Sequence, residues 1–309
     1  MPEGGEKLTI LSTDYTIHQT TVIDCGYNIY QTVAMSKKTK NLKQALNRPK
    51  TIDEILDEQI QTAMHEHERP NASLFLSSIS AGLEIGFSIF LMAAIHSLFF
   101  GVVHPSLLHV LLAMAYPLGF VFVIIGKSEL FTEHTTLAVI PVLNRNVTLK
   151  KLLVLWGIVY GGNLLGGYVF GYILSILPGR MEILDPDSFE ILAKKLTEHP
   201  WNIILGSGIL AGWLMGLLSW LITSARETIS RILLVGLITT VIGIGGLHHC
   251  IVGSIEVFAA VLTSPQITLA DYFTVQLWST VGNIIGGVVF VAFIKFSHAT
   301  GMRSSSRAD

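Results

Sequence analysis

Six long apolar stretches follow residue 73 of this chain, and each is long enough to cross a lipid bilayer, which takes about twenty residues of helix. Half of the 309 residues are hydrophobic, only 14% are charged, and the mean hydropathy is +0.58. Such a chain is too apolar for an ordinary soluble domain, so we expect an all-α integral membrane protein. The expected spans are residues 74–98, 107–142, 152–177, 203–224, 232–262 and 272–296.

The second and fifth stretches are too long to be single straight helices. Polar residues interrupt the second over 126–135, and glycines over 243–246 precede His248 and His249 in the fifth. We therefore expect both helices to break near the membrane midplane. A break leaves peptide groups without hydrogen-bond partners, and each unpaired group costs several kcal/mol in lipid. A histidine side chain at the break must likewise face protein or water and not lipid. Each break must therefore be buried in protein or line a cavity, which makes it a candidate pathway.

The two halves of the membrane portion repeat each other. The first span resembles the fourth at 81–86 and 211–216, and the third resembles the sixth through Gly-Asn-x-x-Gly-Gly at 162–167 and 282–287. Three spans per half is an odd number, so the halves have opposite orientations. The predicted fold is six transmembrane helices in two inverted three-helix repeats, with small residues that let the helices pack closely.

The basic residues predict the orientation. Of the twenty Lys and Arg residues, sixteen share one side, whereas Arg180, Lys194 and Lys195 lie on the other and Lys127 lies in the second-span break. The positive-inside rule then places both termini in the cytoplasm. No apolar leader precedes residue 74, so we expect the first span to act as the insertion signal.

Two polar tails are expected outside the channel domain of residues 73–296. The N-terminal tail, 1–72, shows no sustained periodicity over 1–50, which predicts disorder, but apolar residues recur at helical spacing over 52–68. That pattern predicts a short amphipathic helix on the membrane surface or against the membrane body, with a solvated linker helix as the alternative. Residues 297–309 form the cytoplasmic C-terminal tail.

Three carboxylates in or beside the spans need partners. Glu129 can pair with Lys127 or a backbone amide, and Glu256 can cap or pair within the second half of the fifth span. The sequence indicates no partner for Glu84. Cys25 and Cys250 lie in the tail and in the membrane, so no disulfide is expected.

Together, Glu-Leu-Phe-Thr at 129–132, the paired Gly-Asn-x-x-Gly-Gly segments and a mid-membrane histidine resemble the formate/nitrite transporter family over residues 73–296. The resemblance implies a homopentamer with an aquaporin-like pore in each protomer. It also implies passage of small monovalent anions or their acids, and a multi-pass protein of the bacterial inner membrane without enzymatic activity or cofactor.

The resemblance also implies which residues line the pathway. His249 is the expected central histidine, with Thr132 as its hydrogen-bond partner. Constrictions are expected on either side of it: Leu130, Phe131 and Phe120 toward the cytoplasm, and Tyr116 and Ile242 toward the outside.

An outer vestibule lysine is expected in this family. Lys194 or Lys195 could fill that role, and a solvated helix face is the alternative.

The chain departs from the family pattern at three positions. His248 stands where an acidic residue usually precedes the central histidine, and Gly253 and Gly212 stand where asparagines are usual. The substrate is therefore left open among formate, nitrite and similar anions. We expect the acid form to cross, with His249 donating a proton or stabilising a transient anion.

Other functional classes fit less well. A metal transporter or metal-dependent enzyme could use His134, His248, His249 and Cys250, but consecutive helical residues point about a hundred degrees apart and rarely chelate one ion. An aquaporin-like channel for neutral solutes would carry paired Asn-Pro-Ala signatures, which are missing. A net charge of −2, spread along the chain, gives no sign of nucleic-acid binding.

Overall fold

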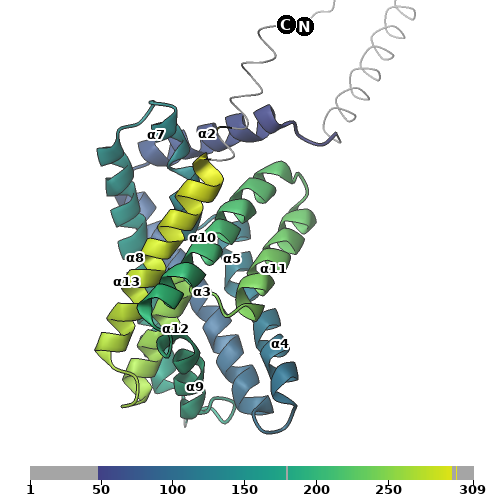
Figure 1. Cartoon of the computed structure of the whole chain (residues 1–309), viewed down its shortest axis with the longest axis vertical. Coiled ribbons are helices and arrows are strands. Elements are labelled where there is room, and N and C mark those ends of the chain that lie inside the picture. Colours follow the sequence, from purple (N-terminus) through teal and green to yellow (C-terminus); the bar gives the residue numbers. More distant parts are fainter. Residues whose placement is uncertain (1–47, 179, 294–296, 298–309) are drawn as a thin grey trace, which may run out of the picture. The chain divides into compact units, whose positions relative to one another are not determined.

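The computed structural model describes residues 48–178, 180–293 and 297. The expected disorder of 1–50 and the C-terminal tail 297–309 fall almost entirely outside these residues. All contacts discussed below lie within the unit that begins at Lys50. Apart from an isolated bridge between Pro178 and Met181, the described secondary structure is helical, which confirms the all-α prediction (Figure 1). The elements are α2 (Ile52–Glu68), α3 (Asn71–Phe99), α4 (Pro105–Ala115), α5 (Pro117–Gly126), α6 (Phe131–Leu137), α7 (Ile140–Leu143), α8 (Leu149–Ile176), α9 (Pro186–Thr197), α10 (Trp201–Ser224), α11 (Thr228–Ile244), α12 (Cys250–Thr263), α13 (Leu269–Ile285) and the π-helical η1 (Gly286–Phe293).

Four helical segments of the described chain are long and apolar enough to cross a membrane. They are α3, the α4–α5 pair, α8 and α10, whereas α11 and α12 are shorter apolar helices. Large apolar side chains such as Leu76, Leu233 and Phe273 are exposed on these and neighbouring helices. Exposed apolar faces of this kind suit contact with lipid or another subunit. The exact arrangement of six spans stays a prediction.

The chain leaves the helix at the two predicted interruptions. Lys127 adopts a left-handed conformation (φ 58°) after α5, and α6 begins at Phe131. Similarly, α11 ends at Ile244, Gly246 has φ 57°, and α12 begins at Cys250. Between α4 and α5 the backbone stays helical at Tyr116 (φ −52°, ψ −39°), and only the helical hydrogen bond that Pro117 cannot donate is missing.

Each half of the structure packs one pair of helices through glycines. Between α3 and α8, a Cβ on Gly82 would collide with the carbonyl of Asn163. Between α10 and α13, a Cβ on Gly212 would collide in the same way with the carbonyl of Asn283. The glycines of both repeated motifs therefore serve close backbone approach, as the sequence interpretation favoured.

Helix α2 packs against the membrane body. A capping box starts it: Thr51 Oγ1 accepts from Glu54 N–H, and the Glu54 carboxylate accepts from Thr51 N–H at 2.9 Å. Its apolar side is buried at Ile55 and Leu56, and Lys50 Nζ donates to the carbonyl of Thr223 in α10 at 2.5 Å. Of the alternatives left by the sequence, the structure supports packing against the body. In Figure 1, α2 lies across one end of the helices and α9 lies at the other end.

Candidate functional site

The centre of the site is a hydrogen bond between the starts of α6 and α12. Thr132 Oγ1 and His249 Nε2 lie 2.8 Å apart, and both side chains are buried. His249 is also the N-cap of α12, since its Nδ1 accepts from Val252 N–H at 3.3 Å. A neutral ring whose Nδ1 accepts must carry its proton on Nε2, so we assign Nε2–H as the donor to Thr132. The imidazole thus presents an N–H donor at the interruption.

Two asparagines, one in each half, hold the interrupted backbone in place. Asn163 Oδ1 accepts from Phe131 N–H at 2.8 Å, and its Nδ2 donates to the carbonyls of Ser78 and Glu129 at 2.8 Å each. These bonds fix the loop before α6. In the sequence, Asn163 stands out only as part of the Gly-Asn-x-x-Gly-Gly segment.

Asn283 does the same for the other half. Its Oδ1 accepts from Cys250 N–H at 2.9 Å, and its Nδ2 donates to the carbonyls of Gly208 and His248 at 2.8 and 2.9 Å. The recurrence of one asparagine in both Gly-Asn-x-x-Gly-Gly segments was the signal that could have indicated this role.

Aromatic rings line the approach to His249. The Phe120 ring lies edge-on to the imidazole with ring centroids 5.2 Å apart, and Tyr116 stacks on Phe120 at 5.4 Å. Phe131 packs edge-on against Tyr160 at 4.8 Å. Leu130, next to Phe131, is fully buried. Phe120, Leu130 and Phe131 are therefore all buried, and Phe120 contacts His249 directly, whereas their role as a constriction stays a prediction.

A pocket of about 70 Å³ lies at the α9 end of the site, and we call it the α9 pocket. Tyr116 and Ile242 line it, as do Lys195, Glu256 and His109. Lys194 instead forms an ion pair with Glu190 at 2.6 Å, and this hydrogen bond lowers the pKa of the Glu190 carboxyl. The structure therefore brings Lys195, and not Lys194, together with the two expected outer constriction residues.

His248 points into the protein. Its Nε2 donates to the carbonyl of Leu196 at 3.0 Å, which leaves Nδ1 to accept from the Ser207 hydroxyl at 2.9 Å. Both ring nitrogens are thus bonded to groups of α9 and α10, away from the Thr132–His249 pair.

The model of the family described as "Formate/nitrite transporter" matches residues 53–297. The chain belongs to this family. It is 30% identical to the inner membrane protein YfdC of Escherichia coli strain K12 over 77% of each chain. It is 26% identical to the nitrite transporter NirC of Salmonella typhimurium strain LT2, over 70% of this chain and 80% of NirC. A solved structure described as a pentameric formate channel with formate bound has a similar fold, with a TM-score of 0.64 and 22% identity over 74% of this chain and 97% of that one.

This member of the formate/nitrite transporter family departs from the family pattern at three positions, and the structure shows what surrounds two of the substituted residues. Gly212 lies against the backbone of Asn283, where a side chain has no room. Gly253 has more space, since an added Cβ would lie 3.5 Å from Leu196 Cδ1, an ordinary contact distance.

Two of the three carboxylates named above, Glu129 and Glu84, have partners that the sequence did not indicate. Glu129 does not pair with Lys127; it accepts from Arg69 Nη1 at 2.6 Å and lies 2.5 Å from His134 Nε2. Arg69 also bonds Glu66 at 3.0 Å, so the end of α2 is tied to the loop before α6. The hydroxyls of Ser80 and Ser128 donate to Glu84.

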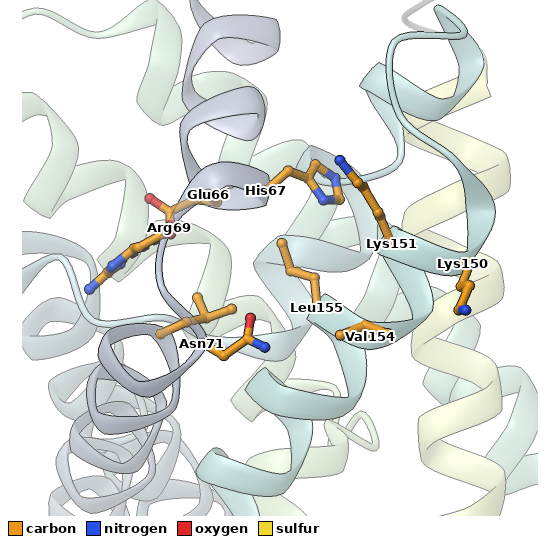
Figure 2. Close-up of a pocket in the computed structure, with 9 residues that line it drawn as sticks. Glu66, His67, Arg69, Asn71, Lys150, Lys151, Val154 and Leu155 are labelled. Atoms are coloured by element: carbon orange, nitrogen blue, oxygen red, sulfur yellow. Dashed lines mark hydrogen bonds and ion pairs between the residues drawn. The ribbon is translucent and has the colours of Figure 1, made fainter.

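A cavity of about 270 Å³ adjoins the Arg69 network. Figure 2 shows Glu66 and Arg69 on one side of it and His67 next to Lys151 on the other. The His67 ring also bonds the carbonyl of Ala138 at 3.1 Å. Basic side chains therefore gather at the end of the protein that carries α2.

Among the described residues, no group of three or more His, Cys, Asp or Glu side chains could hold a metal ion. His134 is directed to Glu129, and His248 to Ser207 and Leu196, so these histidines do not converge on His249. The described geometry gives no support to the metal-transport alternative.

Proposed function

We propose that this protein carries small monovalent anions such as formate or nitrite, or their acids, through a pore in each protomer of a homopentamer in the inner membrane. The family match, the nitrite transporter among its relatives and the fold of a pentameric formate channel support this. The buried hydrogen bond between Thr132 and His249, beside the Phe120 ring, is the single observation that carries the proposal.

The apolar layers favour passage of the neutral acid. A bare carboxylate or nitrite would lose its hydration between Tyr116 and Ile242 on one side and Phe120, Leu130 and Phe131 on the other. The protonated acid largely escapes this penalty. Between the layers, the Thr132 hydroxyl, polarised by the hydrogen bond that it accepts from His249 Nε2–H, and the positive end of the α12 helix dipole stabilise a transient anion. Proton uptake before the layers and release beyond them then makes transport proton-coupled.

The α9 end faces the outside in this proposal, and both termini are cytoplasmic. Most basic residues then lie on the cytoplasmic side, as the positive-inside rule requires. Lys195 is the vestibule cation of this arrangement, because it shares a pocket with Tyr116 and Ile242.

Uptake of labelled formate, nitrite, acetate, lactate and hydrosulfide into vesicles that contain the purified protein tests the proposal. We expect uptake of at least one anion to rise as external pH falls and to increase with an inward proton gradient. Native mass spectrometry should show a pentamer. Electrogenic uptake that ignores the proton gradient would argue for a plain anion channel. Passage of neutral solutes alone would favour the aquaporin-like alternative.

Replacing Lys195 by glutamine should lower uptake at low ionic strength. The ammonium raises the local anion concentration at the mouth, and salt screens this attraction. Lys194→Gln is the matched control, since the Lys194 charge is already neutralised by Glu190. The vestibule role is wrong if the two variants behave alike, or if the effect of Lys195→Gln persists unchanged at high salt.

A further inference from the structure

Glu256 is a carboxylate inside the proposed anion pathway. It lies on α12, only 6% exposed, and lines the α9 pocket with Lys195, Tyr116 and Ile242. Among the described residues, no hydrogen bond or ion pair engages its side chain, so it does not cap or pair within α12 as the sequence suggested. A carboxylate without a protein partner faces the space that a substrate must enter.

The other titratable groups around Glu256 are few. Lys195 of α9 and Tyr116 share its pocket, and so does His109 of α4, whose ring bonds the carbonyl of Ile244 at 2.8 Å. Within α12, Cys250 is buried at the helix start. The nearest titratable side chains of α8 and α13 are Tyr168 and Tyr272, respectively. Their hydroxyls are hydrogen-bonded to each other, and the Tyr272 hydroxyl is also hydrogen-bonded to Ser254. The pocket-lining residues Met92 of α3 and Ile242 of α11 are apolar and do not titrate. Lys195 is thus the one cation that lines the pocket with Glu256 among the described residues.

The charge of Glu256 changes what the pocket accepts. An ionised carboxylate repels an approaching anion and offsets the attraction of Lys195, whereas a protonated one is neutral and leaves Lys195 unopposed. Because the pocket holds only about 70 Å³, a small anion cannot keep away from this carboxyl group.

We propose that Glu256 is a selectivity residue of the pathway, which admits anions beside Lys195 when its carboxyl group is protonated and excludes them when it is ionised. This rests on the proposed function. The role is additional to that of His249, which lies seven positions earlier at the start of α12.

The test is the pH profile of formate and nitrite uptake by the full-length protein in vesicles. Glu256→Gln keeps the neutral state at every pH, so its uptake should exceed that of the wild type several-fold at high external pH and converge with it at low pH. The fraction of free acid in solution is the same for both proteins and cancels in the ratio. Glu256→Asp, which still titrates, should follow the wild-type profile and guards against a folding defect in the glutamine variant.

Glu182→Gln is the matched control, because it removes one exposed carboxylate from the same end of the protein but outside the pocket. We expect it to leave the profile unchanged. A constant ratio of Glu256→Gln to wild type across pH would overturn the inference, and so would an equal shift in Glu182→Gln. No anion uptake by the wild type at any pH would overturn the proposed function, and this inference with it.

Discussion

We expect His249→Phe to abolish anion uptake while the pentamer persists. Phenylalanine fills the space but removes the Nε2–H donor that faces Thr132 and the Nδ1 acceptor that caps α12. Loss of one preorganised donor from a desolvated site costs on the order of a hundredfold in rate where this has been studied in enzymes. The measurement is proton-driven uptake in vesicles, with native mass as the check on assembly.

His249→Asn separates the two functions of this side chain. Asparagine is a good N-cap residue, so α12 keeps its start, but the shorter side chain does not extend to Thr132. We expect this variant to keep its fold, with a loss of about 1–3 kcal/mol for the buried Thr132 hydroxyl left unpaired, and to be nearly as inactive as His249→Phe.

The control for these variants is His248→Gln, which should affect stability more than uptake because the His248 ring forms hydrogen bonds only with Ser207 and the Leu196 carbonyl. Equal loss of uptake in the His248 and His249 variants would remove the special role of His249.

The second large effect is expected from Asn283→Ala. The substitution leaves Cys250 N–H and the carbonyls of Gly208 and His248 without their partner. Each buried polar group left unpaired costs about 1–3 kcal/mol, and the backbone that carries His249 loses its anchor. We therefore expect a clear fall in thermal stability together with loss of uptake.

Asn163→Ala should produce the same double defect, since Asn163 holds the equivalent loop in the other half. Asn202→Ala on the exposed start of α10 is the matched control and should change neither property. Full activity and an unchanged melting temperature in either anchor variant would show that the asparagines do not fix the pathway backbone.

Local sequence signals predicted much of the fold. Polar residues over 126–135 and glycines and histidines over 243–249 predicted interruptions close to where α5 and α11 end, because such residues oppose helix formation or burial in lipid. The periodicity of 52–68 predicted α2. These features depend on neighbours in the chain.

Features that depend on distant residues could not be predicted in the same way. Arg69 meets Glu129 across sixty positions, and no short-range pattern relates them. Choosing between Lys194 and Lys195 required the rotation of α9 about its own axis, since consecutive helical residues point about a hundred degrees apart. For the same reason, the position of Glu256 beside Lys195 became visible only with α12 and α9 packed together.

The two anchoring asparagines hold the main chain of the interruptions independently of the side chains that we propose to set selectivity. They bind main-chain atoms, so the positions of the interrupted backbones do not depend on which side chains project from Tyr116, Ile242 or Glu256. Substitutions at those three positions can alter the width and charge of the α9 pocket, and so of the proposed pathway, while the anchored peptide groups stay in place. Such an architecture lets a transporter acquire a new substrate through single amino-acid changes, without rebuilding its fold.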